Sequence, residues 1–273
     1  MRERRKSLSW PMARTLSGRS PRDQWAYQER QRALAERSMR RALASEVRRA
    51  IIALGAAHGD GLREAQAMAE HRQNMEAILR RAYDGLFQRI GGDIAREGPK
   101  AHPHLFLERK FADRFEAAAR MWISQMVANK VTPIIRTTQK DAIRIIRAAT
   151  QQGWAEGLGQ DAIGRLIMAQ ITQRGGEIAR WRANVIARTE THTAAQAAGF
   201  EAEASLGLTL RKQWVAAADE RTRDSHAEAD EQIVGHADDY TVGGHSCQYP
   251  GDPSLPPEES INCRCASVAI VED

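Results

Sequence analysis

The sequence predicts a mostly α protein, in which an N-terminal helical region is followed by a small α+β C-terminal domain with a short antiparallel sheet. Two observations predict this class. Apolar residues recur at every third or fourth position over much of residues 23–206, a spacing typical of amphipathic helices. Beyond Gly207 apolar and polar residues alternate, as they do in half-buried strands. Only 5% of the residues are aromatic, so the cores are expected to be rich in Ala, Leu and Ile.

The N-terminal helical region contains breaker residues between its apolar stripes. Gly91-Gly92 and segment 97–104, which holds two prolines, are expected to interrupt the helices, because proline lacks an amide donor and glycine costs extra backbone entropy. Pro133 is expected to end or kink a further helix. The four apolar stripes of this region predict helices at residues 43–54, 75–90, 111–126 and 135–150.

A glycine-rich connection at residues 153–159 follows these helices. It lacks the preceding strand and the Gly-Lys-Ser/Thr of a phosphate-binding loop, so we interpret it as a linker. Asp161 is expected to cap a short helix at residues 163–171 that Gly175-Gly176 closes. A longer helix is predicted at residues 177–206, and Gly207 is well placed to stop it.

The C-terminal pattern predicts short strands. In residues 208–215 the side chains of Leu208, Leu210, Lys212 and Trp214 share one face. Further strands are predicted at residues 232–234, 240–242 and 265–271. The chain is therefore divided into a basic flexible leader (1–22), a helical bundle or stalk (23–154) and an α+β domain (155–273).

Composition narrows the class of protein. The chain has no apolar run of about 18 residues, and its charged start leads into no apolar signal region. Three cysteines, all near one end, do not resemble the paired framework of a small secreted domain. We therefore expect a soluble protein, with no membrane partner, that folds in a reducing cytoplasm.

Charge is distributed unevenly along the chain. Residues 1–50 contain 14 Lys and Arg against 5 Asp and Glu, whereas residues 219–273 contain 3 against 13. The basic leader is predicted to neutralise DNA phosphates by counterion release. The alternative is a solvated, disordered arm, because charge runs alone carry no specificity. The predicted nucleic-acid-binding residues are Arg2, Arg4, Arg5, Lys6 and Arg14, with Arg19 and Arg22 also in the leader.

The cysteines suggest a metal site. Cys263 and Cys265 lie two residues apart on or before a strand, so both sulfurs face one side. Their Cα atoms would be roughly 6.6 Å apart, near the upper limit for a relaxed disulfide, which favours a shared zinc ion. His226 is the first candidate for a further ligand and Cys247 the second, with His236 and His245 also available. The alternative is that the two cysteines are small buried apolar residues.

The polar residues around this site are interpreted as structural. Asp219 is expected to cap the helix that holds Arg221 and Arg223, and Arg223 or Arg264 is expected to pair with a carboxylate and join two loops. A hydrolase needs a nucleophile with an orienting base or an open metal position. No nucleophile is identified, so no catalytic residue is predicted.

Several motifs in a fixed order carry a resemblance to a known family. They are Ile186-Ala-Arg-Thr-Glu190 with Gly199, then Trp214, Asp219-Glu-Arg-Thr-Arg-Asp-Ser-His226, Tyr249-Pro-Gly-Asp-Pro253 and Ile261-Asn-Cys-Arg-Cys265. Over residues 155–270 the chain resembles the Mu F / SPP1 gp7 family of phage minor head proteins. Asp230-Glu231 replaces an expected Asp/Asn-Gly pair, and Cys247 is outside the family pattern. The residues expected to maintain the domain are Arg188, Glu190, Trp214, Asp219, Arg221, His226, Asn262, Cys263, Arg264 and Cys265.

The resemblance implies a virion component for head morphogenesis. Such a protein joins the procapsid through the portal protein, with scaffold or major capsid protein as further partners, and stays inside the head near packaged double-stranded DNA. Host cytoplasm would be its location during assembly. Two alternatives remain: an ADP-ribosyltransferase-like or zinc-dependent enzyme or toxin module, and a non-specific DNA-binding protein.

Overall fold

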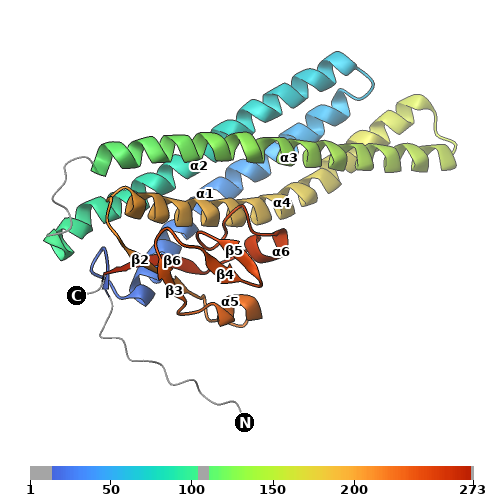
Figure 1. The fold of residues 1–273 in the computed structure, drawn as a ribbon. Helices are drawn as coiled ribbons and strands as arrows, with labels where there is room; N and C mark the ends of the chain where they lie inside the picture. The colour runs from blue at the N-terminus through green and yellow to red at the C-terminus, as the bar shows by residue number, and fades with distance from the viewer. Residues whose placement is uncertain (1–13, 104–110, 272–273) are drawn as a thin grey trace, which may run out of the picture. The chain divides into compact units, whose positions relative to one another are not determined.

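A computed structural model describes residues 14–103 and 111–271 of the protein. Within these residues, four long helices precede a region of short strands and helices (Figure 1). This arrangement confirms the predicted class, mostly α with a small antiparallel sheet near the C-terminus. The long helices are α1 (Pro21–Ala56), α2 (Gly61–Ala101), α3 (Phe111–Ala155) and α4 (Gln160–Ala204).

Two of the connections between these helices are tight turns. Between α1 and α2, the Asp60 carboxylate accepts hydrogen bonds from the backbone N–H groups of Leu62 and Arg63, each at 3.1 Å. This is the usual way to satisfy the free donors at a helix start. Between α3 and α4, Gly157 adopts a φ of +67°, a conformation that glycine adopts at little cost.

The predicted helix interruptions at the glycine pairs were wrong. Helix α2 runs through Gly91-Gly92 and α4 runs through Gly175-Gly176. A Cβ atom on Gly91 would lie 2.0 Å from the Phe115 ring, and one on Gly175 would lie 2.9 Å from Ile51. These glycines therefore permit close side-chain packing against a helix that continues.

The two proline predictions also need correction. Pro99 lies inside α2, so the expected break at residues 97–104 starts only at the end of that helix, at Ala101. Pro133 lies inside α3, which is continuous from Phe111 to Ala155, so it does not end a helix; the alternative of a kink stays a prediction. Similarly, the glycine linker starts later than expected, because Gly153 still lies in α3, two residues before the helix ends at Ala155.

The chain forms two compact units that interleave along the sequence. The helical unit comprises Gln31–Gln88 and Glu116–Ala195, and the sheet unit comprises the described residues of Met1–Arg30, Arg89–Phe115 and Gln196–Asp273. The predicted linear division at residues 22 and 154 concerns the sequence alone and stays a prediction.

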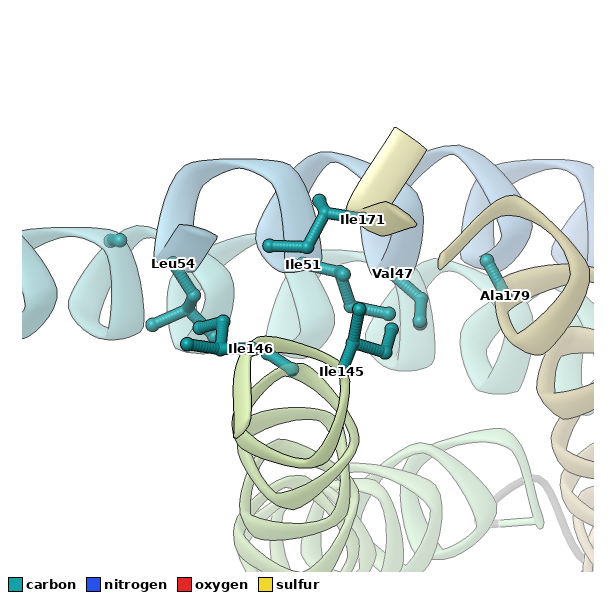
Figure 2. Packing of buried hydrophobic residues seen from close by; sticks show 9 residues of the cluster. Val47, Ile51, Leu54, Ile145, Ile146, Ile171 and Ala179 are labelled. Atoms are coloured by element: carbon teal, nitrogen blue, oxygen red, sulfur yellow. The ribbon is translucent and has the colours of Figure 1, made fainter. Parts of the chain in front are cut away.

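All four long helices contribute to one core of the helical unit. Val47, Ile51 and Leu54 of α1 face Ile145 and Ile146 of α3, with Ile171 and Ala179 of α4 beside them (Figure 2). Ala67 of α2 and Ala142 of α3 complete the cluster. Burial of a Leu, Ile or Val side chain stabilises a fold by roughly 1.5–3 kcal/mol, so this core joins two helical hairpins into one bundle.

The sheet unit contains a four-stranded antiparallel sheet in the order β1-β6-β2-β3 (Figure 1). In the central pair, Arg211 lies opposite Ile270 and Val215 opposite Ala266. A separate hairpin pairs β4 with β5. The strands are β1 (Arg14–Thr15), β2 (Arg211–Val215), β3 (Ile233–Gly235), β4 (Tyr240–Val242), β5 (His245–Cys247) and β6 (Ala266–Val271).

Side chains from the ends of two long helices hold the sheet. The Gln196 side chain accepts a hydrogen bond from the Ser267 N–H at 2.8 Å, and Glu203 accepts one from the Ala269 N–H at 3.1 Å. From α1, the Trp25 indole N–H donates to the Arg264 carbonyl at 2.9 Å. Trp25 also packs on the apolar cluster that contains Val268.

None of the helices in the described part of the chain is both long and apolar enough to span a lipid bilayer.

Candidate metal centre and its surrounding motif

His226 lies on a short helix whose position is fixed from outside. Helix α5 (Asp224–Glu228) starts after Arg223, whose side chain makes no capping hydrogen bond. Instead, the Arg223 guanidinium donates to the carbonyl of Ile261 at 2.5 Å. This contact ties α5 to the segment that carries the two C-terminal cysteines.

Cys263 and Cys265 lie where the chain turns from α6 (Pro257–Ser260) into β6. Asn262 has a φ of +58°, a left-handed conformation that Asn tolerates better than most residues. Both cysteines are reduced and buried. The turn therefore presents two thiol groups to the interior of the sheet unit.

The structure brings three predicted ligands together. His226 Nδ1 is 3.3 Å from Cys265 Sγ and 3.6 Å from Cys263 Sγ, and the three candidate ligand atoms all lie within 4.8 Å of one another. In a tetrahedral zinc site with bonds of about 2.3 Å to sulfur and 2.0 Å to nitrogen, a nitrogen and a sulfur ligand are separated by about 3.5 Å. The residues present therefore fit a zinc ion.

Glu259 fixes the orientation of the histidine ring. Its Oε2 atom lies 2.9 Å from His226 Nε2 and accepts a hydrogen bond from the Ser225 hydroxyl at 2.9 Å. With Nε2 directed at a carboxylate, Nδ1 faces the two sulfurs. Metal-binding histidines commonly use their second nitrogen in this way.

The two sulfur atoms are electrostatically different. A hydrogen bond from Cys263, with smaller contributions from His226 and the Ala217 backbone, lowers the pKa of Cys265. Burial, followed by the hydrogen bond to Cys265, raises the pKa of Cys263. The pair therefore favours one thiolate and one thiol, and the thiolate is the form of cysteine that binds metal.

The prediction of Cys247 as a ligand is not supported by this geometry. Cys247 lies on β5 and is buried in the same apolar cluster, but it is outside the three-residue group. Burial raises the pKa of its thiol to about 12. The other histidine candidates are also elsewhere: His236 stacks on Phe200 at 4.5 Å, and His245 is exposed.

An aromatic wall surrounds the group. Trp214 is fully buried and meets His226 edge-on, with ring centroids 5.6 Å apart. Tyr240 packs against the same indole at 5.3 Å, and its hydroxyl lies 2.9 Å from Ser267 Oγ. A metal ion at this position would be enclosed by apolar surface.

Asp219 and Arg264 join two loops, as expected of Arg264. The Arg264 guanidinium contacts both carboxylate oxygens of Asp219, and this contact lowers the pKa of Asp219. The predicted helix cap by Asp219 was wrong, because its carboxylate accepts the Arg221 N–H at 3.0 Å in a turn that precedes α5.

The Arg188 and Glu190 pair belongs to the helical unit. Glu190 accepts a hydrogen bond from the Tyr83 hydroxyl at 2.8 Å and lies 3.4 Å from Lys130 Nζ. Arg188 lies 3.7 Å from Glu36. These residues join all four helices of the bundle.

Part of the predicted leader is held in place. Arg14 pairs with Val271 in the sheet, and its side chain donates to the Gly18 carbonyl at 3.0 Å. Arg19 forms an ion pair with Asp93, which is 1% exposed. The other predicted nucleic-acid-binding residues, Arg2, Arg4, Arg5 and Lys6, lie outside the described residues.

Three functional side chains have no sequence pattern that predicts them. Glu259 lies 33 positions from its partner His226, and Glu203 joins His236 to the sheet. The sequence predicts that Lys212 lies on the same strand face as Trp214, but it does not predict that Lys212 is buried. Its Nζ donates to the Gln248 carbonyl at 2.8 Å and lies 4.9 Å from the Phe200 and Tyr240 rings.

Comparison with known proteins agrees with the ordered motifs. Residues 144–268 match the family described as Phage Mu protein F like protein. Over 143 residues the chain is 27% identical to the minor head protein GP7 of Bacillus phage SPP1, covering 51% of this chain and 44% of that protein. Over 238 residues it is 19% identical to the uncharacterized protein YqbB of Bacillus subtilis (strain 168), covering 74% and 78%.

An enzyme is also among the similar proteins. The chain is 34% identical over 109 residues to the NAD(+)–arginine ADP-ribosyltransferase EFV of Enterococcus faecalis (strain ATCC 700802 / V583), covering 35% of this chain and 22% of that protein. The chain thus spans less than half the length of two of these three relatives. No solved structure matches the chain.

Proposed function

Because residues 144–268 match the family described as Phage Mu protein F like protein, we propose that the chain is a minor head protein of a tailed bacteriophage. In this proposal it takes part in head morphogenesis, joins the procapsid through the portal protein and remains inside the head. The observation that carries the proposal is the family match together with the similarity to a phage minor head protein. Host cytoplasm would be its location during assembly.

The contacts of the sheet unit support a role in attachment. Asp219 pairs with Arg264, His226 with Glu259 and Arg223 with the Ile261 carbonyl. These contacts join two loops that are 33 to 45 positions apart in the sequence and would brace the surface used for docking. Portal is the proposed partner, with scaffold or major capsid protein as further partners.

DNA is the second proposed partner. Arg2, Arg4, Arg5 and Lys6 would contact packaged DNA, because basic segments neutralise phosphates irrespective of sequence. Arg14 is a weaker candidate than the sequence suggests, since it is paired within the sheet unit.

The metal centre is proposed to hold one structural zinc ion. His226, Cys263 and Cys265 would supply three of its ligands. A zinc ion here would brace α5 against the turn before β6, since structural zinc contributes directly to folding. Elemental analysis of protein purified under reducing conditions should give about one zinc per chain; absence of metal would reject the site and leave the head-protein role intact.

The enzyme alternative rests on the similarity to an ADP-ribosyltransferase. That alignment covers 22% of the transferase, so most of the enzyme has no counterpart in it. The three-residue group is also buried, so a zinc-dependent reaction there would require its side chains to become exposed. We therefore propose a structural role, and NAD turnover by the purified chain would contradict it.

The decisive experiment measures whether the chain is incorporated into assembled heads. The full chain would be co-expressed with portal, scaffold and major capsid protein of the same phage, with portal omitted in a parallel assembly. Presence of the chain in heads that contain portal, and its absence from heads without portal, would support the proposal. Equal incorporation in both assemblies would reject portal as the route of entry.

A further inference from the structure

The helical unit carries a surplus of positive charge that the basic leader does not explain. Residues 31–88 and 116–195 contain 21 Lys and Arg, of which 19 are Arg, against 13 Asp and Glu. Arginine binds phosphate and carboxylate groups through two parallel hydrogen bonds, which lysine does not do. The unit is therefore suited to bind an anion.

A groove on this unit gathers part of that charge. It lies between α1 and α4, has a volume of about 640 Å³, and is lined by Ala44, Ser45, Arg48, Arg49, Ile52, Ala53, Gly176 and Arg180. The two helices that line the groove pack closely against each other. Ile171 of α4 occupies the place of a Cβ on Gly55, and Ile51 of α1 that of a Cβ on Gly175.

Two arginines are available to a ligand. Among the described residues, no carboxylate pairs with Arg48 of α1 or Arg180 of α4, and both are exposed. Arg49 is different, because Glu46 and Glu70 hold its guanidinium at 2.8 and 3.0 Å. Arg49 is therefore held in place by two carboxylates. The guanidinium groups of Arg48 and Arg180 have no carboxylate partner in the described part of the chain, so one from each helix can reach a ligand in the groove.

A second basic groove on the same unit indicates a ligand with repeated charges. It has a volume of about 540 Å³ and is lined by Lys140, Ile143, Arg144, Arg147, Ala148 and Gln151 of α3. Of its cations, Arg144 pairs with Asp141, whereas Lys140 and Arg147 have no carboxylate partner among the described residues. Several unpaired cations on one unit favour a polyanion over a single acidic side chain.

We propose that the groove between α1 and α4 binds the phosphate backbone of DNA, with Arg48 and Arg180 contacting phosphates and Arg49 held beside them. The proposal rests on the proposed function, which places the chain near packaged DNA, but it names a contact separate from the leader. Binding would be independent of base sequence, since backbone contacts carry no sequence information directly.

The test is the salt dependence of binding to a fluorescent 30-base-pair duplex, measured by anisotropy with the full chain. Each lost phosphate contact lowers the slope of log Kobs against log salt by roughly 0.9. Arg48→Gln/Arg180→Gln should therefore lower the slope by about 2 and weaken binding to duplexes of different sequence alike. Arg48→Lys/Arg180→Lys, which keeps both charges, should retain most of the slope.

Arg37→Gln/Arg165→Gln is the matched control. It removes two exposed arginines without carboxylate partners from the same helices, outside the groove. A slope change equal to that of the groove variant would overturn the proposal, because diffuse charge would then explain binding. Competition by polyglutamate as strong as by DNA would also overturn the phosphate assignment. Portal-dependent incorporation, measured separately, would survive either result, so the two proposals fail independently.

Discussion

His226 Nε2 lies 2.9 Å from Glu259 Oε2, while the Nδ1 atom of the same ring lies 3.3 Å from Cys265 Sγ. One ring nitrogen thus meets a carboxylate and the other a sulfur. This arrangement fixes the orientation of the ring and directs Nδ1 towards the sulfur atoms.

Glu259→Gln should weaken zinc binding about 10- to 100-fold, because the carboxylate orients His226 and raises the basicity of its ring. A chelator competition titration would measure the change. Glu258→Gln is the matched control, since this neighbouring carboxylate is exposed. Equal zinc affinity for both variants would show that Glu259 does not position the histidine.

Cys263→Ser and Cys265→Ser should each abolish stoichiometric zinc binding, because serine does not supply the thiolate that zinc prefers. Cys247→Ser should keep one zinc per chain. Cobalt substitution gives a direct measurement, since thiolate-to-cobalt charge-transfer absorption reports sulfur ligands. Loss of that absorption in Cys247→Ser would restore Cys247 to the ligand set.

Lys212→Met should change how stability depends on pH. Burial lowers the pKa of Lys212 from its ordinary 10.5 to about 8, against smaller opposing effects of Glu203, Asp239, Cys247 and Asp238. The unfolded chain therefore binds more protons between these values. In that range this lysine makes the wild-type stability rise with pH, by at most about 1.4 kcal/mol per unit.

The Lys212→Met variant should lack this contribution, so its stability relative to wild type should be greatest below pH 8 and decline towards pH 10.5. Urea unfolding of both proteins across this range would measure the difference, in which the other titrating groups cancel. If the difference in unfolding free energy between variant and wild type did not vary with pH, Lys212 would carry the same charge in the folded and unfolded states.

Gly91→Ala and Gly92→Ala should have opposite effects on stability. A Cβ on Gly91 would lie 2.0–2.8 Å from three ring atoms of Phe115, whereas one on Gly92 would meet nothing within 4 Å. Overpacking costs typically about 1–3 kcal/mol, while glycine to alanine in a free helix position gains about 0.5–1 kcal/mol. The melting temperatures of the two variants would measure this difference. A higher melting temperature for Gly91→Ala than for Gly92→Ala would contradict the packing of Phe115 against Gly91.

The sequence predicted those parts of the fold that have a local pattern. Alternation located β4 at its observed bounds and most of β2 and β6, because a half-buried strand has a period of two. It missed β1, which has two residues, and β5, whose His245 and Ser246 are both exposed. The predicted helix ends at the two glycine pairs were wrong because the role of Gly91 and Gly175 depends on packing against Phe115 and Ile51, which come from other helices.

The candidate site was predicted to a similar degree. The spacing of Cys263 and Cys265 predicted that both sulfurs face one side, and the structure brings His226 next to them, as expected. Cys247 was included because sequence position gives no distance between separate loops. Glu259 was missed for the same reason, since its contact with His226 depends on how α6 folds back towards α5.

The interleaving of the two compact units limits how the protein can be divided. Trp25 donates to the Arg264 carbonyl and packs beside Val268, and Arg22 donates to the Ala216 carbonyl. A recombinant fragment that starts at residue 155 would lack both of these side chains and would leave an apolar patch of its sheet in water. Expression of the C-terminal part as an isolated piece is therefore expected to give aggregates.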